Sequence, residues 1–158
     1  MENQLDHLDV QILSALTQNA RIVFSQLAEK LGVSNSLIHQ RVRKLKEAGI
    51  LAEPVFQVRP GKLGYQTCAF IQIMIEKPRY VREIIEQLEQ IPEIVECVDI
   101  SGRYALMVKI YTLNNSHLRD ILHEQILSLP GVEGTNTLIS FETVFNRTVA
   151  LPTASDDA

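Results

Sequence analysis

Residues 27–45 read LAEKLGVSNSLIHQRVRKL. In this stretch one apolar stripe ends at Gly32, and a second stripe begins after Ser34. A glycine can adopt the left-handed conformation that ends a helix, and a serine can cap the first turn of the next helix. Two helices joined by about three residues with a glycine in the turn form a helix-turn-helix. The stretch therefore predicts this motif, with Val33 filling the corner and the small Ala28 letting the helices approach closely.

The residues before the motif predict one more helix. Apolar side chains recur at helical spacing from Leu8 to Leu16, and Asp6 is suited to cap the first turn. The segment 19–21 ends this helix, a second short helix follows up to Gly32, and the third helix stops at Gly49. Residues 1–50 are therefore expected to form a three-helix domain.

The rest of the chain alternates strand and helix patterns. Residues 51–65 predict an extended connector, because Pro54 interrupts an otherwise strand-like run and 59–64 is rich in turn residues. We then expect strands at 67–76, 95–101, 104–112 and 135–145, and helices at 80–91 and 118–126. The order βαββαβ is the ferredoxin-like pattern. The fold class is therefore α+β, with domains at 1–50 and 66–150, a hinge at 51–65 and a disordered tail at 151–158.

The first predicted strand is apolar on both of its faces. Ile71 and Ile73 lie on one side, and Phe70 and Met74 lie on the other. Two helices cover only one face of a four-stranded sheet, so the other face calls for a partner. We expect a homodimer that packs sheet to sheet. The alternative is that the N-terminal helices or the connector fold over this face.

Charge is distributed unevenly along the 158 residues. The chain has 15 basic and 19 acidic side chains, net −4, but residues 1–50 are net +1 and residues 51–158 are net −5. Within the third helix, the stretch 35–48 is net +3. An acidic protein with one basic helix can touch a polyanion at a defined place without binding it everywhere.

The exposed face of the third helix suits the major groove of DNA. Ser36, His39, Gln40 and Arg43 follow the spacing i, i+3, i+4, i+7, and their side chains can hydrogen-bond to base edges. Other polar and basic side chains are better placed for phosphates, which fix the register of the protein on the duplex. This second set is Arg21, Ser34, Asn35, Lys44 and Lys46. Two helix-turn-helix motifs on a symmetric dimer would recognise a near-palindromic DNA sequence. The alternative is an ordinary three-helix bundle with a solvated polar face.

Enzymes, metalloproteins and membrane proteins are disfavoured. No nucleophile motif is present, Cys68 and Cys97 fall in predicted strands, and the histidines lack metal-ligand spacing, so we expect no catalytic residue, metal or cofactor. The four histidines are His7, His39, His117 and His123. The acidic, polar start is unlike a secretion signal, and no apolar run approaches the roughly 18–20 residues of a membrane helix. Two distant cysteines suit the reducing cytoplasm.

RNA binding is a rival function, because ferredoxin-like sheets can carry RNA. That mode needs aromatic side chains on the central strands. Those strands offer residues that suit a partner sheet instead, namely Ile71, Ile73, Leu106 and Val108.

Motifs along nearly the whole chain, about residues 5–150, resemble the Lrp/AsnC family, the feast/famine transcriptional regulators. The matching residues are Leu8-Asp9, Ile12-Leu13, Asn19-Ala20-Arg21, Leu27-Ala28, Gly32-Val33-Ser34, Ile38-His39-Gln40-Arg41-Val42, Leu45, Ala48-Gly49-Ile50, Leu63-Gly64-Tyr65, Pro92-Glu93-Ile94, Ser101-Gly102-Arg103-Tyr104 and Pro130-Gly131-Val132. The resemblance implies a winged or plain helix-turn-helix domain followed by an effector-binding, oligomerising domain. It also implies dimers that assemble further into tetramers or octamers.

The resemblance further implies a small effector, usually an amino acid, held between dimers near the turn that joins the second and third strands. Carried onto this chain, the effector-binding residues are Ser101, Gly102, Arg103 and Tyr104, with Thr135, Asn136 and Thr137 on the last strand. Family members commonly carry an acid just after the tyrosine, where this chain has Ala105, so Arg103 is free to favour an acidic ligand. The alternative is that residues 101–104 are only a hairpin turn.

Overall fold

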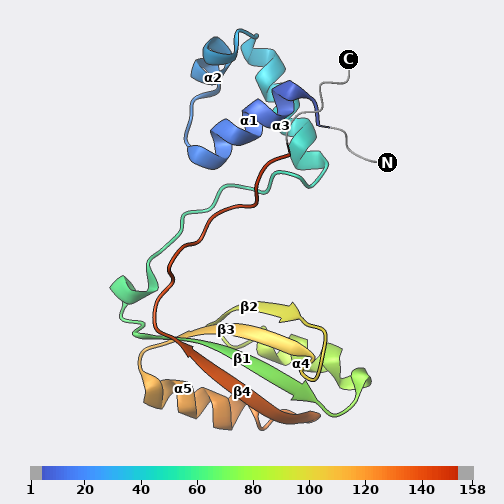
Figure 1. Ribbon diagram of the computed structural model, residues 1–158, viewed down its shortest axis with the longest axis vertical. Coiled ribbons are helices and arrows are strands. Elements are labelled where there is room, and N and C mark those ends of the chain that lie inside the picture. The colour runs from blue at the N-terminus through green and yellow to red at the C-terminus, as the bar shows by residue number, and fades with distance from the viewer. Residues whose placement is uncertain (1–4, 153–158) are drawn as a thin grey trace. The chain divides into compact units, whose positions relative to one another are not determined.

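The computed structural model of the protein describes residues 5–152 and divides into two compact units (Figure 1). One unit holds the residues up to Gln57 together with those from Phe145 onward, and the other is Val58–Val144. The division falls inside the predicted connector. The segment from Phe145 differs from the expected domain limits, since it belongs with the helices: Leu151 packs against the helical core. Residues 153–158 of the predicted tail lie outside the described residues.

The helical unit contains α1 (His7–Gln18), α2 (Phe24–Leu31) and α3 (Asn35–Glu47). The predicted caps are confirmed. The Asp6 carboxylate accepts a hydrogen bond from the Asp9 N–H, and Ser34 Oγ accepts one from the Leu37 N–H. Gly32 ends α2 with a φ of 67°, in the left-handed region. The connector after α3 forms no strand between residues 48 and 66.

One apolar core holds the three helices together. Its fully or nearly fully buried members come from all three of them: Ile12, Leu13, Leu27, Ala28, Ile38, Val42 and Leu45. Ala28 of α2 is buried in this core, and its carbonyl accepts a hydrogen bond from the Val33 N–H of the turn at 3.0 Å. Burial of the Ile38 and Val42 side of α3 leaves the opposite side of that helix facing solvent.

The second unit is the predicted βαββαβ arrangement. Its elements are β1 (Thr67–Ile75), α4 (Val81–Leu88), β2 (Ile94–Asp99), β3 (Leu106–Thr112), α5 (Asn115–Ile121) and β4 (Val132–Ser140), with short helical turns at Pro60–Leu63 (η1), Pro78–Tyr80 (η2) and Leu122–Ile126 (η3). The strand order is β2-β3-β1-β4, with all neighbours antiparallel. Both α4 and α5 lie against the same side of the sheet (Figure 1).

The last strand was predicted too late in the chain. It begins at Val132 rather than at 135, because a bulge at Met74/Ile75 lets Val132 and Gly134 pair with the end of β1. It ends at Ser140 rather than at 145, because Ser140 already pairs with Cys68, next to the first residue of β1. The predicted helix 118–126 also changes form, since η3 is a π-helix.

The alternation of the central strands is confirmed. The side chains facing α4 and α5 are almost fully buried, and they include Ile71, Ile73, Leu106 and Val108. The intervening side chains of β1 and β3 are only half-buried in this single chain. We call this second side the open face of the sheet.

Candidate functional site

The predicted reading face lies on α3 as the sequence indicates. Ser36, His39, Gln40 and Arg43 are all exposed, on the side of the helix opposite buried Ile38. Gln40 makes no side-chain hydrogen bond to any described residue. Arg43 Nε lies 3.9 Å from Glu47 Oε1, and both side chains are about 70% exposed, so water weakens this ion pair. Gln40 and Arg43 are therefore available to a ligand.

His39 and Ser36 have local partners that sequence reasoning missed. The His39 ring packs edge-on against Phe24 of α2, with 4.9 Å between the ring centroids. The Ser36 and Ser34 hydroxyls are 3.0 Å apart, while Ser34 also caps the helix. These contacts hold the start of α3 and the imidazole in fixed positions. The apolar character of Phe24, at the first residue of α2, was the available signal for its role.

The phosphate candidates are also exposed, but their charges differ in availability. Asn35 and Lys44 are exposed, and Lys44 has no ion-pair partner among residues 5–152. Lys46 Nζ lies 2.8 Å from Glu53 Oε1 in the connector, which neutralises part of its charge. The Arg21 guanidinium lies 4.7 Å above the centre of the Phe56 ring, a cation–π contact that leaves its charge unneutralised.

Arg41 contributes to structure although it belongs to the same basic helix. Its guanidinium binds the carboxylates of Asp6 and Asp9 at the start of α1, and the Asp9 side chain is only 5% exposed. The hydrogen bond to Asp6 raises the pKa of Arg41. Part of the net +3 charge of the stretch 35–48 is therefore neutralised by Asp6 and Asp9 within the helical unit. The same contacts hold α3 against the start of α1.

Low pH should weaken the ion pair between Arg41 and Asp6. Burial opposes ionisation of Asp6, but the hydrogen bond from the Asp9 N–H and the Arg41 guanidinium outweigh it and lower the pKa of Asp6 below its ordinary value of 3.8. The ionised carboxylate therefore stabilises the fold above pH 3.8, and this contribution is lost as the pH falls through the lowered pKa. We expect Asp6→Asn, which keeps a capping side chain, to be less stable than the wild type at neutral pH. In urea unfolding, the difference between the two free energies of unfolding should shrink as the pH falls below 3.8 and through the lowered pKa. A difference that stays constant as the medium is acidified would contradict this role.

The turn between β2 and β3 is attached firmly to the sheet. Gly102 has a φ of 114°, in the left-handed region that favours glycine. The Ile100 N–H donates to Ala105 O at 2.9 Å, and the Ala105 N–H donates to Ile73 O at 3.0 Å. Ser101 and Arg103 are exposed, Tyr104 is half-buried, and Arg103 Nε lies 3.5 Å from Met74 Sδ. Arg103 therefore reaches over the open face of β1.

The three predicted residues of β4 do not all face this turn. Asn136 Nδ2 donates to Gln72 Oε1 at 2.8 Å, on the open face. Thr135 and Thr137 pair with Ile73 and Ile71, so they lie on the helix-covered side of the sheet, and Thr137 Oγ1 is buried without a hydrogen-bond partner in the structure. Within one chain, the structure therefore brings Asn136 and Arg103 to the same face and separates them from both threonines.

Two open-face residues near the turn were missed. Gln72 is the one polar side chain between Phe70 and Met74 on the open side of β1, and that break in an apolar strand was the available signal. Met74 contacts Arg103. Gln72, Met74 and Asn136 therefore lie on the open face, with Arg103 of the turn beside Met74.

The four residues that were expected to disfavour RNA binding lie on the helix-covered face of the sheet. Ile71, Ile73, Leu106 and Val108 are buried beneath α4 and α5, so they say nothing about what the other side binds. The open face carries Phe70 on β1 and Tyr111 on β3, with Lys109 Nζ lying 5.7 Å and 5.5 Å from the two ring centres. Single-stranded RNA is therefore a ligand to test against duplex DNA.

Residues 5–152 contain no cluster of three or more histidine, cysteine or carboxylate side chains that could hold a metal ion. Burial and the nearby Asp99 carboxylate raise the pKa of Cys97, which keeps this thiol protonated. In the same range, no helix is both long enough and apolar enough to cross a membrane.

Comparisons with known proteins cover both units. Residues 5–52 match the family model described as winged helix-turn-helix DNA-binding, and residues 68–150 match the Lrp/AsnC ligand binding domain. The HTH-type transcriptional regulator FL11 of Pyrococcus horikoshii is 36% identical over 152 residues, which is 96% of this chain and 99% of that protein.

Solved structures agree over the same length. The structure of AsnC from Escherichia coli is 33% identical with a TM-score of 0.87, covering 92% of this chain and 97% of that chain. A feast or famine regulatory protein from M. tuberculosis, complexed with L-methionine, is 25% identical with a TM-score of 0.85, covering 94% of this chain and 99% of that chain. The relatives are transcriptional regulators and not enzymes. This chain therefore belongs to the Lrp/AsnC family of transcriptional regulators, with a helix-turn-helix DNA-binding domain followed by a ligand binding domain.

Proposed function

We propose that two copies of this chain bind a near-palindromic DNA operator, each through the domain at residues 1–50. Gln40 and Arg43 contact base edges, with Ser36 and His39 beside them on the same face. Arg21, Ser34, Asn35 and Lys44 contact phosphates. The observation that carries this proposal is the exposed polar face of α3, which lies on the side of the helix opposite the buried Ile38 and Val42. The α3 helix is fixed by Arg41 to α1, so the reading side chains stay in place on binding.

The dimer forms through the open face of the sheet in the domain at residues 66–150, with residues 51–65 as the hinge. One helix-turn-helix contacts few base pairs, and a symmetric pair reaches two major-groove faces about 34 Å apart. The half-buried side chains of β1 and β3 support sheet-to-sheet packing. Further association of the dimers into tetramers or octamers would align several reading heads along one duplex, in the cytoplasm where the chromosome lies.

DNA binding is tested by electrophoretic mobility shift with duplex DNA, at several salt concentrations. Affinity should fall steeply as salt rises, because phosphate contacts release counterions. An excess of unlabelled single-stranded RNA is the competitor that distinguishes the rival function. Duplex binding that survives the RNA supports the regulator. Preferential binding of the RNA would instead assign the function to Phe70 and Tyr111 on the open face.

We further propose that an amino acid binds beside the turn at Ser101–Tyr104. Arg103 lies exposed in this turn, and its cationic side chain suits the carboxylate of an amino acid. The M. tuberculosis relative bound L-methionine, which makes this amino acid the first to test. Thr135 and Thr137 lie on the helix-covered side of the sheet. They would therefore contact the amino acid only from that side of β4, or they would contact one that is held by a second dimer. Binding would change the dimer–dimer arrangement and so alter how the reading heads line up.

Calorimetry against the twenty amino acids should give heat with at least one of them. Removing the charge with Arg103→Ala should then weaken binding about tenfold or more, because hydrogen bonds to charged groups contribute roughly 1.5–3 kcal/mol. Arg82→Ala is the matched control, since Arg82 is an exposed arginine on α4 that pairs with Glu86. Absence of heat with all twenty amino acids would leave residues 101–104 as a plain hairpin turn.

A further inference from the structure

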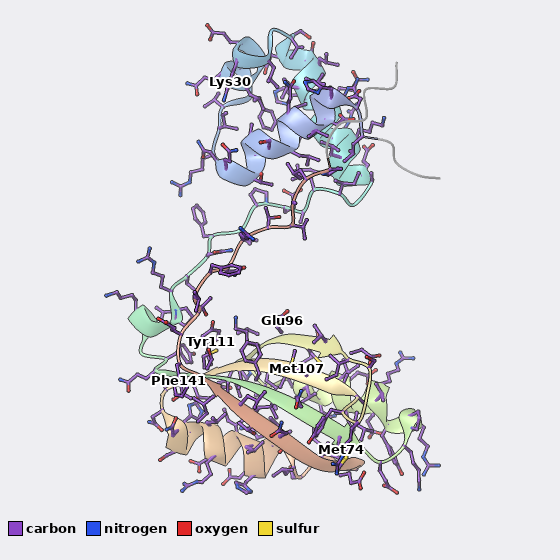
Figure 2. The ribbon with its side chains drawn as sticks, viewed as in Figure 1. Lys30, Met74, Glu96, Met107, Tyr111 and Phe141 are labelled. Carbon is purple, nitrogen blue, oxygen red and sulfur yellow. The ribbon has the colours of Figure 1, made fainter. Side chains whose placement is uncertain are left out.

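The strand register places two opposite charges in one row across the open face. Glu96 of β2 pairs with Lys109 of β3, Lys109 pairs with Phe70 of β1, and Phe70 pairs with Leu138 of β4. Among the described strand residues that pair with a neighbour on this face, Lys109 is the one base and Glu96 the one acid, while Arg103 of the β2–β3 turn reaches over the end of β1 at Met74. The remaining open-face positions are apolar or uncharged polar, and Figure 2 labels Met74, Glu96, Met107 and Tyr111 among the side chains of this sheet.

The two charges do not neutralise each other within the chain. Neither Lys109 nor Glu96 forms an ion pair with any residue in 5–152. The Lys109 ammonium instead lies against the rings of Phe70 and Tyr111, at 5.7 Å and 5.5 Å from their centres. Phe70 belongs to β1, on the side of β3 away from β2, so the ammonium leans toward the middle of the face. Glu96 stays exposed on the edge strand.

When a partner covers the open face, the charges of Lys109 and Glu96 lose contact with water, and this desolvation costs free energy. Glu96 stands opposite Lys109 on the neighbouring strand but forms no ion pair with it in the described residues, so a partner with only apolar side chains would desolvate both charges without giving either a contact, which is strongly unfavourable. A second copy of this chain brings one acid and one base of its own. A two-fold axis that sets Lys109 of one copy against Glu96 of the other generates two equivalent pairs, and each charge then gains a contact that an apolar surface cannot supply.

We propose that Lys109 of one copy pairs with Glu96 of the other, and that this pair selects which chains associate through the open face. The inference rests on the proposed sheet-to-sheet dimer and adds its partner specificity. A related chain without an acid at the position of Glu96 is rejected, because Lys109 then stays buried and unpaired.

Charge reversal tests the pair with three variants of the full chain. Lys109→Glu places two acids against two acids across the axis, and Glu96→Lys places two bases against two bases. Each variant alone should dimerise about 100-fold more weakly than the wild type, because two favourable pairs become repulsive. An equal mixture of the two variants should form a heterodimer with nearly wild-type affinity, and the double variant should again form a homodimer. Native mass spectrometry, with a tag on one chain, counts the homodimers and heterodimers.

A matched control reverses a charge pair away from the open face. Arg82 Nε and Glu86 Oε1 lie 3.2 Å apart in an exposed ion pair on α4. The Arg82→Glu and Glu86→Arg variants should therefore dimerise with wild-type affinity, and a mixture of the two should form homodimers and heterodimers at random. If Lys109→Glu and Glu96→Lys also mix at random with wild-type affinity, the pairing rule is wrong while the dimer stands. If each variant is weakened and mixing restores nothing, the pair acts within one chain and the proposal is overturned. A monomeric wild type would overturn the proposed dimer itself.

Discussion

Arg43→Ala should sharply reduce selective binding to the operator while leaving the fold intact. An arginine that binds a guanine in bidentate fashion contributes about 1–3 kcal/mol of base discrimination. A dimer loses two such contacts, so specific affinity should fall roughly 30-fold to 10⁴-fold. The side chain is 73% exposed and its one ion pair, to Glu47, is long and solvated, so thermal stability should change little. Fluorescence anisotropy with the selected operator and with scrambled DNA measures both affinities.

Lys44→Ala is the matched control for this result. Lys44 follows Arg43 on α3 and is also exposed, but we assign it to a phosphate. Its loss should weaken binding to operator and scrambled DNA alike and should reduce the slope of affinity against salt. An Arg43→Ala protein that kept the full preference of the wild type for the operator would remove Arg43 from the reading set.

Arg41→Ala should destabilise the helical unit by about 2–3 kcal/mol. Removing one partner of a buried charge pair leaves the other charge without compensation, which typically costs about 3–5 kcal/mol. Arg41 is 26% exposed, so we expect a loss below that range, but the Asp9 carboxylate that it leaves behind is 5% exposed. Operator affinity should fall as well, because α3 loses its attachment to α1. Urea unfolding followed by circular dichroism measures the loss.

Lys30→Ala controls for the removal of a positive charge from the same unit. Lys30 lies exposed near the end of α2, and Figure 2 labels its side chain. Its substitution should change the free energy of unfolding by no more than about 0.5 kcal/mol. If Arg41→Ala were equally harmless, the contact with Asp9 would contribute nothing to the fold.

Local chemistry made much of this fold predictable. Gly32 and Ser34 end one helix and start the next through backbone requirements that depend only on adjacent residues, and both caps form as expected. The same holds for Asp6. The alternation along β1 also survives folding, because it reflects which side chains must leave water.

Features that depend on contacts between residues far apart in the chain could not be predicted from the sequence. Arg41 looks like another DNA-facing cation, and its role appears only when Asp9, 32 positions earlier, is brought beside it. The side of the sheet on which Thr135 and Thr137 lie follows from their register against β1, and a shift of one residue would reverse it. The end of β4 was misplaced for the same reason, since its length is set by where β1 begins.

Selection of bound duplexes from a random DNA pool tests the central idea most directly, namely that the open sheet face couples two exposed α3 helices. The pool is presented to the full-length protein with and without an amino-acid mixture. We predict enrichment of inverted repeats whose half-site centres are about 10 base pairs apart, or a multiple of one helical turn. Enrichment of single unrepeated sites, or of no duplex at all, would contradict the account.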